Sequence, residues 1–151
     1  MAKIKLAEDF SEFLSLCLKH RVKFLVIGGY AVVHYSRPRY TGDLDLWVEM
    51  SPTNAERIAA VLEDFGFKGS DASPEPFTKE KQVVRMGFEP FRLELFTTIP
   101  GVCFAECYPN KTMVNINGND IPFIGLGDLR TNKAASGRDK DLLDLEELPE
   151  P

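Results

Sequence analysis

Two acidic residues, Asp43 and Asp45, alternate with leucines in the segment DLDLWVE (43–49). The alternation predicts a strand, and residues two apart on a strand project from the same face, about 6–7 Å apart along the backbone. Two carboxylates about 4 Å apart repel by roughly 4 kcal/mol at an effective dielectric constant near 20, so a cation, an arginine or water must offset the repulsion. Carboxylate ligands without a nearby His or Cys favour Mg²⁺ or Mn²⁺ over zinc. The alternative is an ordinary solvated strand face.

A pair of glycines precedes these acids. Gly28 and Gly29 end the apolar run KFLVIG (23–28), which predicts a buried strand, and they precede YAVVHY, which predicts one or two helical turns. Glycine backbone N–H groups at a helix N-terminus suit an anion such as phosphate. A tight turn chosen for packing is the alternative for the glycine pair alone. Together, a phosphate cradle followed after one short helix by paired acids is the arrangement that metal–triphosphate chemistry requires.

The elements that must position these residues follow from local patterns. Helical spacing of apolar residues predicts a helix over 7–20, and Ser51-Pro52-Thr53 opens another through about Phe65, with Thr53 and Glu56 in capping-box spacing. Residues 69–80 are rich in Gly, Ser, Pro and charge, which predicts a flexible loop. Further strands are predicted at 82–88 and 91–97, joined at Glu89-Pro90, and in a hairpin over 112–124 that turns at 117–119. A helical region follows from Gly127, with a break near Gly137.

This order of helices and strands predicts an α+β fold, a mixed sheet with helices packed on it. The length of 151 residues fits one domain spanning 1–151, and 44% apolar residues can build a core. No apolar run approaches the roughly 20 residues of a membrane span, and no signal-peptide pattern follows the N-terminus. Three cysteines without zinc spacing indicate reduced thiols and a cytoplasmic protein. The net charge of −5 disfavours bulk DNA binding.

Three segments of the chain carry a family resemblance: GGYAVVHYSRPRYTGDLDLWV (28–48), RLELFTTIPGV (92–102) and NKAASGRDKDLLDLEEL (132–148). The sequence resembles the DNA polymerase β-like nucleotidyltransferase superfamily, whose signature is a Gly-Gly or Gly-Ser pair, a spacer and an acid-x-acid strand. More specifically, it is similar to small bacterial and archaeal nucleotidyltransferases related to the AbiEii-type toxins and MNT-type antitoxins. The resemblance runs through most of the chain and implies the nucleotidyltransferase fold.

The resemblance also implies a set of site residues. The superfamily uses a third carboxylate on a later strand, and Glu94 in the alternating segment RLELF (92–96) matches it, although Asp is commoner there. A salt bridge to a neighbouring arginine is the alternative for Glu94. Catalytic and metal-binding roles are thereby implied for Asp43, Asp45 and Glu94, and nucleotide-binding roles for Gly28, Gly29, Arg39, Thr41 and Lys133. Arg138 and Lys140 are expected to pair with Asp139, Asp141 or Asp144 rather than with a ligand.

The implied reaction is transfer of a nucleoside monophosphate from a triphosphate, with ATP favoured, to a hydroxyl acceptor by a two-ion Mg²⁺ or Mn²⁺ mechanism. The acceptor is left open as a protein, an RNA end or a small molecule. Because a chain of this length leaves little surface to hold an acceptor, we expect a second subunit or a partner to supply it. The alternative function is an antitoxin-like partner of a toxin, whose nucleotide site is regulatory or degenerate.

Overall fold

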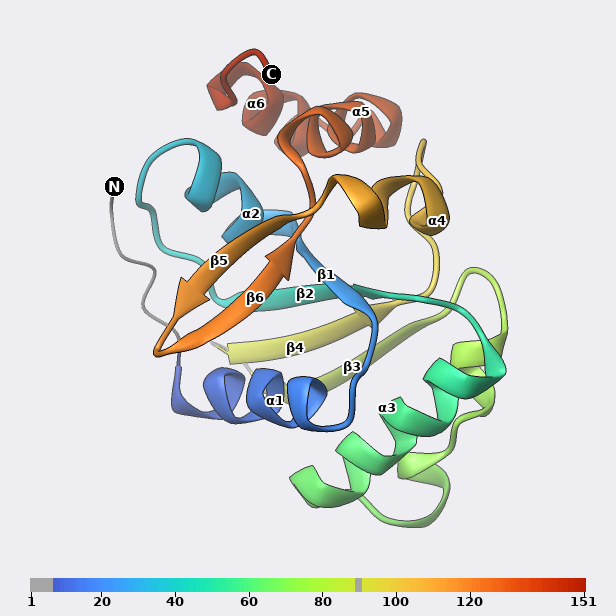
Figure 1. Cartoon of the computed structure of the whole chain (residues 1–151). Helices are drawn as coiled ribbons and strands as arrows, with labels where there is room; N and C mark the ends of the chain where they lie inside the picture. The colour runs from blue at the N-terminus through green and yellow to red at the C-terminus, as the bar shows by residue number, and fades with distance from the viewer. Residues whose placement is uncertain (1–6, 89–90) are drawn as a thin grey trace.

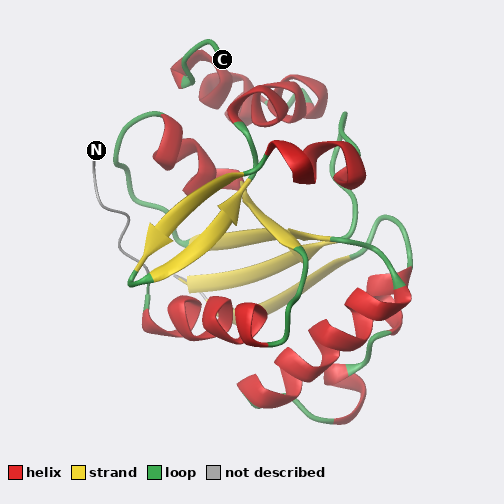
Figure 2. Ribbon diagram, viewed as in Figure 1, coloured by secondary structure: helices red, strands yellow, loops and turns green. Residues whose placement is uncertain are grey.

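The computed structural model describes residues 7–88 and 91–151 as a six-stranded mixed sheet with helices on both sides (Figures 1 and 2). The spatial order of the strands is β3-β4-β2-β1-β6-β5. The strands are β1 (Phe24–Ile27), β2 (Asp43–Val48), β3 (Val83–Phe88), β4 (Phe91–Phe96), β5 (Thr112–Ile116) and β6 (Asn119–Phe123). Strand β2 runs parallel to β4 and antiparallel to β1, while β1 runs parallel to β6. The glycine pair at the end of β1 and the acids of β2 therefore lie at the centre of the sheet.

The helices form two layers. Figure 1 shows α1 (Glu8–Lys19) and α3 (Pro52–Phe65) on one side of the sheet, where Phe13 and Phe65 meet edge to face at 5.2 Å between ring centroids. Helices α2 (Gly28–Tyr35), α4 (Phe104–Cys107), α5 (Leu126–Ser136) and α6 (Asp139–Glu147) lie on the other side. Short 3₁₀ helices connect them: η1 (Gly69–Ala72), η2 (Glu75–Thr78) and η3 (Tyr108–Asn110). In the described residues, no helix is long and apolar enough to cross a bilayer.

Several local predictions are confirmed. The two predicted hairpins exist, β3 with β4 and β5 with β6, although the turn at 89–90 lies outside the described residues. In the second hairpin Asn117 and Gly118 both have positive φ, 52° and 87°, as a two-residue turn with the twist of its strands requires. Gly137, in the left-handed region, separates α5 from α6.

Other local predictions are wrong in detail. Helix α3 is capped by Ser51, whose hydroxyl accepts from the Asn54 backbone N–H at 3.1 Å, so Thr53 and Glu56 form no capping box. Pro52 accounts for the shift, because proline favours the first helical position and leaves the preceding residue as the cap. The predicted loop at 69–80 instead contains η1 and η2, whose Ala72 and Phe77 are buried in the core. Because this segment inserts apolar side chains into the core, it is an ordered connection packed against the rest of the domain.

Candidate active site

The acid-x-acid strand and the later acid lie side by side. Because β2 and β4 pair in parallel with Asp43 opposite Arg92 and Asp45 opposite Glu94, the three acids occupy adjacent positions on one face of the sheet. The strand order brings them together, although Glu94 is far from the other two in the sequence.

Two of the three carboxylates form a salt bridge with an arginine. Arg85 Nε donates to Glu94 Oε2 at 3.0 Å, and Arg92 Nε approaches Asp43 Oδ1 at 3.4 Å. The Glu94 contact is the salt bridge that the sequence left open as an alternative. Within residues 7–88 and 91–151, no three His, Cys, Asp or Glu side chains are close enough to form a metal site. The backbone therefore aligns the acids while the arginines neutralise two of them.

Asp45 is the acid without such a partner. Its Oδ1 atom is buried and accepts no hydrogen bond from the residues that the structure describes, whereas a buried carboxylate ordinarily has a partner. Burial raises the pKa of Asp45 to about 7, and the neighbouring charges of Glu94 and Asp43 add to the increase. A divalent cation fits this oxygen in charge and in ligand chemistry, with Asp43 and Glu94 as flanking oxygen donors on the same face.

The glycine pair packs directly against this site. Gly28 has φ +68°, and a Cβ atom there would collide with Asp45 Oδ2. A Cβ atom on Gly29 would come within 2.7 Å of Thr41 Cγ2. Among the described residues, the buried Thr41 Oγ1 neither donates nor accepts a hydrogen bond. Since α2 begins at Gly28, the first backbone N–H groups of this helix, which cannot bond within the helix, lie beside Asp45.

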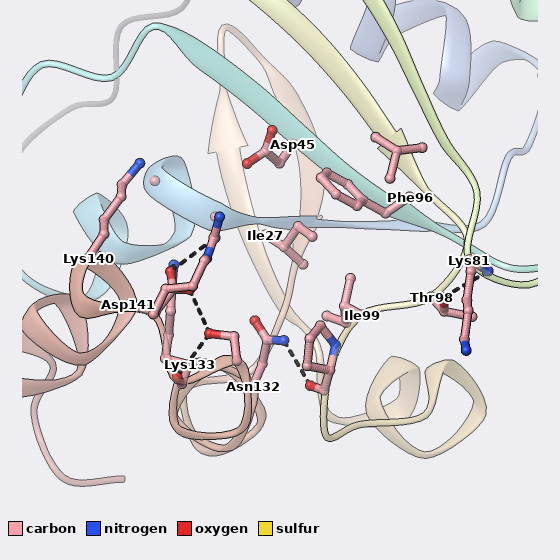
Figure 3. Close-up of a pocket in the computed structure, with 16 residues that line it drawn as sticks. Ile27, Asp45, Lys81, Phe96, Thr98, Ile99, Asn132, Lys133, Lys140 and Asp141 are labelled. Carbon is pink, nitrogen blue, oxygen red and sulfur yellow. Dashed lines mark hydrogen bonds and ion pairs between the residues drawn. The ribbon is translucent and has the colours of Figure 1, made fainter.

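A cavity of about 480 Å³ opens beside Asp45, between the β1–α2 turn, the end of β4 and helix α5; we call it the Asp45 cavity (Figure 3). Four of its lining side chains are cationic and two are acidic, although the whole chain carries a net charge of −5. The ionic lining residues are Lys81, Lys133, Arg138, Lys140, Asp45 and Asp141. Apolar residues, among them Phe96 and Ile99, line the side opposite Lys133 and Lys140, where Lys81 also lies (Figure 3). The cavity therefore offers an anion site next to an apolar wall.

Lys133 is buried and held by helix α6. Its Nζ atom lies 3.0 Å from Asp141 Oδ1 and 3.3 Å from Asp144 Oδ2, and both acids are themselves buried. Burial alone would raise the pKa of Asp141, but hydrogen bonds from Arg138, Ser136 and Lys133 outweigh it and keep that pKa well below its usual value. Lys133 thus lines the Asp45 cavity as an immobilised cation.

Two arginines of the 36–42 loop, Arg37 and Arg39, are held by the same helix. Arg39 Nη1 donates to Asp144 Oδ1 at 2.7 Å, and Arg37 pairs with Glu147 at 3.5 Å. Arg39 is therefore engaged with α6 and does not line the Asp45 cavity. Arg138 pairs with Asp141 at 2.7 Å, as expected from the sequence, while Lys140 makes no ion pair among the described residues and lines the cavity.

Sequence reasoning missed part of the lining. Lys81, Phe96 and Ile99 reach the cavity because β3 begins, and β4 ends, beside α5. No local pattern in the sequence indicates that contact. Asn132 also lines the cavity; it stands next to Lys133 in the segment quoted for the family resemblance, which is the one signal that could have drawn attention to it.

Comparisons with known proteins show the family and the fold of this chain. A family model described as "Nucleotidyl transferase of unknown function (DUF2204)" matches residues 6–150. No curated protein matches the sequence. A solved structure of TM1012 from Thermotoga maritima, a candidate nucleotidyltransferase, has a TM-score of 0.61 and 14% identity, covering 91% of this chain and 88% of that one. The lincosamide antibiotic adenylyltransferase LnuA, solved with lincomycin bound, has a TM-score of 0.59 and 14% identity, covering 95% of this chain and 97% of its own. The predicted α+β nucleotidyltransferase fold is confirmed.

Proposed function

This chain belongs to the DUF2204 family of nucleotidyl transferases, and we propose that it transfers a nucleoside monophosphate from a nucleoside triphosphate to a hydroxyl group. The observation that carries the proposal is the buried, unpartnered Oδ1 of Asp45 between two in-register acids and a cationic cavity. Such an oxygen calls for a cation, and the cationic lining next to it calls for a polyanion. A metal-chelated triphosphate satisfies both.

In this proposal Asp43, Asp45 and Glu94 hold Mg²⁺ or Mn²⁺. Two such ions, when bound, would neutralise the triphosphate and lower the pKa of the acceptor hydroxyl. The arginines that now pair with Asp43 and Glu94 would release those carboxylates, because each pair is partly solvent-exposed and is worth only about 1 kcal/mol or less.

The chain's own groups account for the rest of the chemistry. The backbone N–H groups at Gly28 and Gly29 would receive phosphate oxygens, with Lys133 and Lys140 adding charge from the opposite wall. Thr41 Oγ1, buried beside Gly29 and without a hydrogen bond to any described residue, would donate to a phosphate oxygen. The acceptor oxygen attacks the α-phosphorus, the bond from that phosphorus to the bridging oxygen breaks, and pyrophosphate leaves. Glu94 can take the proton of the hydroxyl. For Arg39 we propose an indirect role through the 36–42 loop.

We propose ATP as the donor, since the adenylyltransferase LnuA shares the fold. LnuA is described as acting on a lincosamide antibiotic, so a small hydroxyl-bearing acceptor is one option, alongside an RNA end or a protein. We also propose that the chain is related to the AbiEii-type toxins and MNT-type antitoxins. We also propose that the chain acts as one domain and that a second subunit or partner protein supplies the acceptor surface.

The test is incorporation of label from α-labelled ATP with Mg²⁺ and a panel of acceptors. We expect labelled product that disappears in the Asp43→Ala, Asp45→Ala double variant while its circular dichroism stays unchanged. Glu75→Ala is the matched control, because this exposed acid does not line the Asp45 cavity and, among the described residues, pairs with Lys79 on the surface. ATP binding without incorporation into any acceptor would argue against the transferase.

The arginine pairs favour a second candidate function. An acid set neutralised by Arg85 and Arg92 also suits a chain that binds nucleotide without turnover, as an antitoxin-like partner would. Neutralisation of a toxin encoded beside this chain, retained by the Asp43→Ala, Asp45→Ala double variant, would support it. Loss of toxin neutralisation in that variant would instead support the catalytic function.

A further inference from the structure

Helix α5 carries a polar side chain that the proposed reaction does not use. Asn132 is 8% exposed and lies one residue before Lys133, with its side chain in the Asp45 cavity. Its Nδ2 atom donates to the Pro100 carbonyl at 2.9 Å. Since a carbonyl oxygen can only accept, this contact fixes the amide orientation, with nitrogen towards Pro100 and oxygen away from it.

The carbonyl oxygen of Asn132 is therefore directed into the cavity. Figure 3 shows it pointing towards Ile27 and Asp45, while the nitrogen bonds the loop below. Among the residues that the structure describes, no group donates a hydrogen bond to this oxygen. The oxygen is not among the fully buried, unpaired polar atoms of the described residues; it is open to the cavity, where a donor on a ligand can reach it.

The loop that fixes the amide is itself tightly constrained. Gly101 has φ +80°, and a Cβ atom there would collide with the Ala135 side chain of α5. Only glycine allows this approach in this backbone conformation, and the approach brings the Pro100 carbonyl within reach of Asn132. The orientation of Asn132 is thus imposed by packing before any ligand arrives, which is what a selective contact requires.

The position of Asn132 along the cavity identifies the part of the ligand it faces. Figure 3 shows Lys133 and Lys140 on one side of Asn132 and Ile99, together with Lys81, on the other side. With the triphosphate beside Lys133 and Lys140, as proposed above, the nucleoside extends past Asn132 towards Ile99. Resting on that proposed function, we propose that Asn132 is a specificity-determining residue whose Oδ1 accepts a hydrogen bond from a donor of the bound nucleoside, a ribose hydroxyl or an exocyclic amine.

The test is a binding cycle with ATP analogues in Mg²⁺ without acceptor, measured by calorimetry. The analogues are 2′-deoxy-ATP, 3′-deoxy-ATP and purine riboside triphosphate, each lacking one donor. We expect the wild type to bind one analogue about tenfold more weakly than ATP, the loss typical of one hydrogen bond. Asn132→Ala should lose the same factor for ATP and show no further loss for that analogue, whose identity separates ribose from base. Thr131→Ala, an exposed neighbour on α5, should bind like wild type.

Two results would overturn the inference while leaving the proposed function intact. One is wild-type binding of all three analogues within twofold of ATP, a measurement that does not depend on any variant folding. The other is an Asn132→Ala variant that weakens all four ligands by the same factor. If the wild type binds no nucleotide at all, the proposed function and this inference are both wrong.

Discussion

Asp45 of β2 and Glu94 of β4 are opposite residues on neighbouring parallel strands, and this register is what gathers acids from distant parts of the chain. The same register places Arg92 opposite Asp43 and, on the next strand, Arg85 opposite Glu94. Each acid except Asp45 thus has a cation one strand away. Asp45, by contrast, has Ile27 and Glu94 as its opposite residues, and neither is a cation.

The first prediction concerns the pH dependence of stability. Because the folded-state pKa of Asp45 is raised to about 7, the folded chain binds more protons than the unfolded chain between its ordinary pKa of 3.8 and about 7. Asp45 therefore lowers stability as the pH rises through that window. Without metal, the free energy of unfolding of wild type relative to Asp45→Asn should fall by about 2 kcal/mol between pH 5 and pH 8. Urea unfolding of both proteins measures it, and a pH-independent difference would contradict the prediction.

The second prediction concerns the turn at Gly28. Alanine at this position pays about 1–2 kcal/mol for the left-handed conformation and adds a collision with Asp45. Gly137→Ala is the control, because Gly137 has nearly the same φ, +67°, with open space around it. Gly28→Ala should be the more destabilising in thermal or urea unfolding and should abolish ATP binding. Adding Asp45→Ala should recover the excess loss of stability; equal costs for the two glycines would refute the contact.

The third prediction concerns the cation held by α6. Lys133→Met leaves two buried carboxylates with one partner fewer, so we expect a loss of about 3 kcal/mol in the free energy of unfolding. Lys140→Met, in the same cavity but exposed and without an ion pair among the described residues, should change it by less than about 0.5 kcal/mol. Similar values for the two variants would show that the buried pairs contribute no more than a surface charge.

The fourth prediction concerns thiol reactivity. Of the three cysteines, Cys103 is exposed, whereas Cys17 and Cys107 are buried. Burial raises the pKa of both buried thiols, that of Cys107 to about 12, which suppresses the reactive thiolate. A disulfide reagent at pH 8 should modify one thiol rapidly and the other two only after unfolding. The fast phase should vanish in Cys103→Ser; two or more fast thiols in the native protein would disprove this burial pattern.

Much of the fold could be predicted from the sequence because its signals are local. The alternation in DLDLWVE, the Gly28-Gly29 junction and the Asn117-Gly118 turn each depend on neighbouring residues, and each appears where expected. The order of strands was not predictable in this way. It depends on which apolar faces pack together across the whole chain, a choice that no short window of sequence contains.

The site residues likewise fall into those that local sequence patterns predict and those that depend on contacts between distant segments. The residues proposed to bind phosphate and metal belong to short motifs, so their types and spacing were readable. The residues that hold them in place were not, since Asp144 reaches both Arg39 and Lys133 only after α6 has docked. Asn132 was not predicted for a similar reason, because the orientation of its side-chain amide depends on the Pro100 carbonyl, which is distant in sequence.

The position of α6 in the chain has a consequence for biosynthesis. Residues 139–147 leave the ribosome after every strand of the sheet, yet Asp141 and Asp144 are the partners of Lys133, and Asp144 also holds Arg39. A nascent chain can therefore complete its sheet while both cations still lack their carboxylates. Nucleotide recognition is expected to mature after the sheet has formed, when α6 closes over α5 and the 36–42 loop.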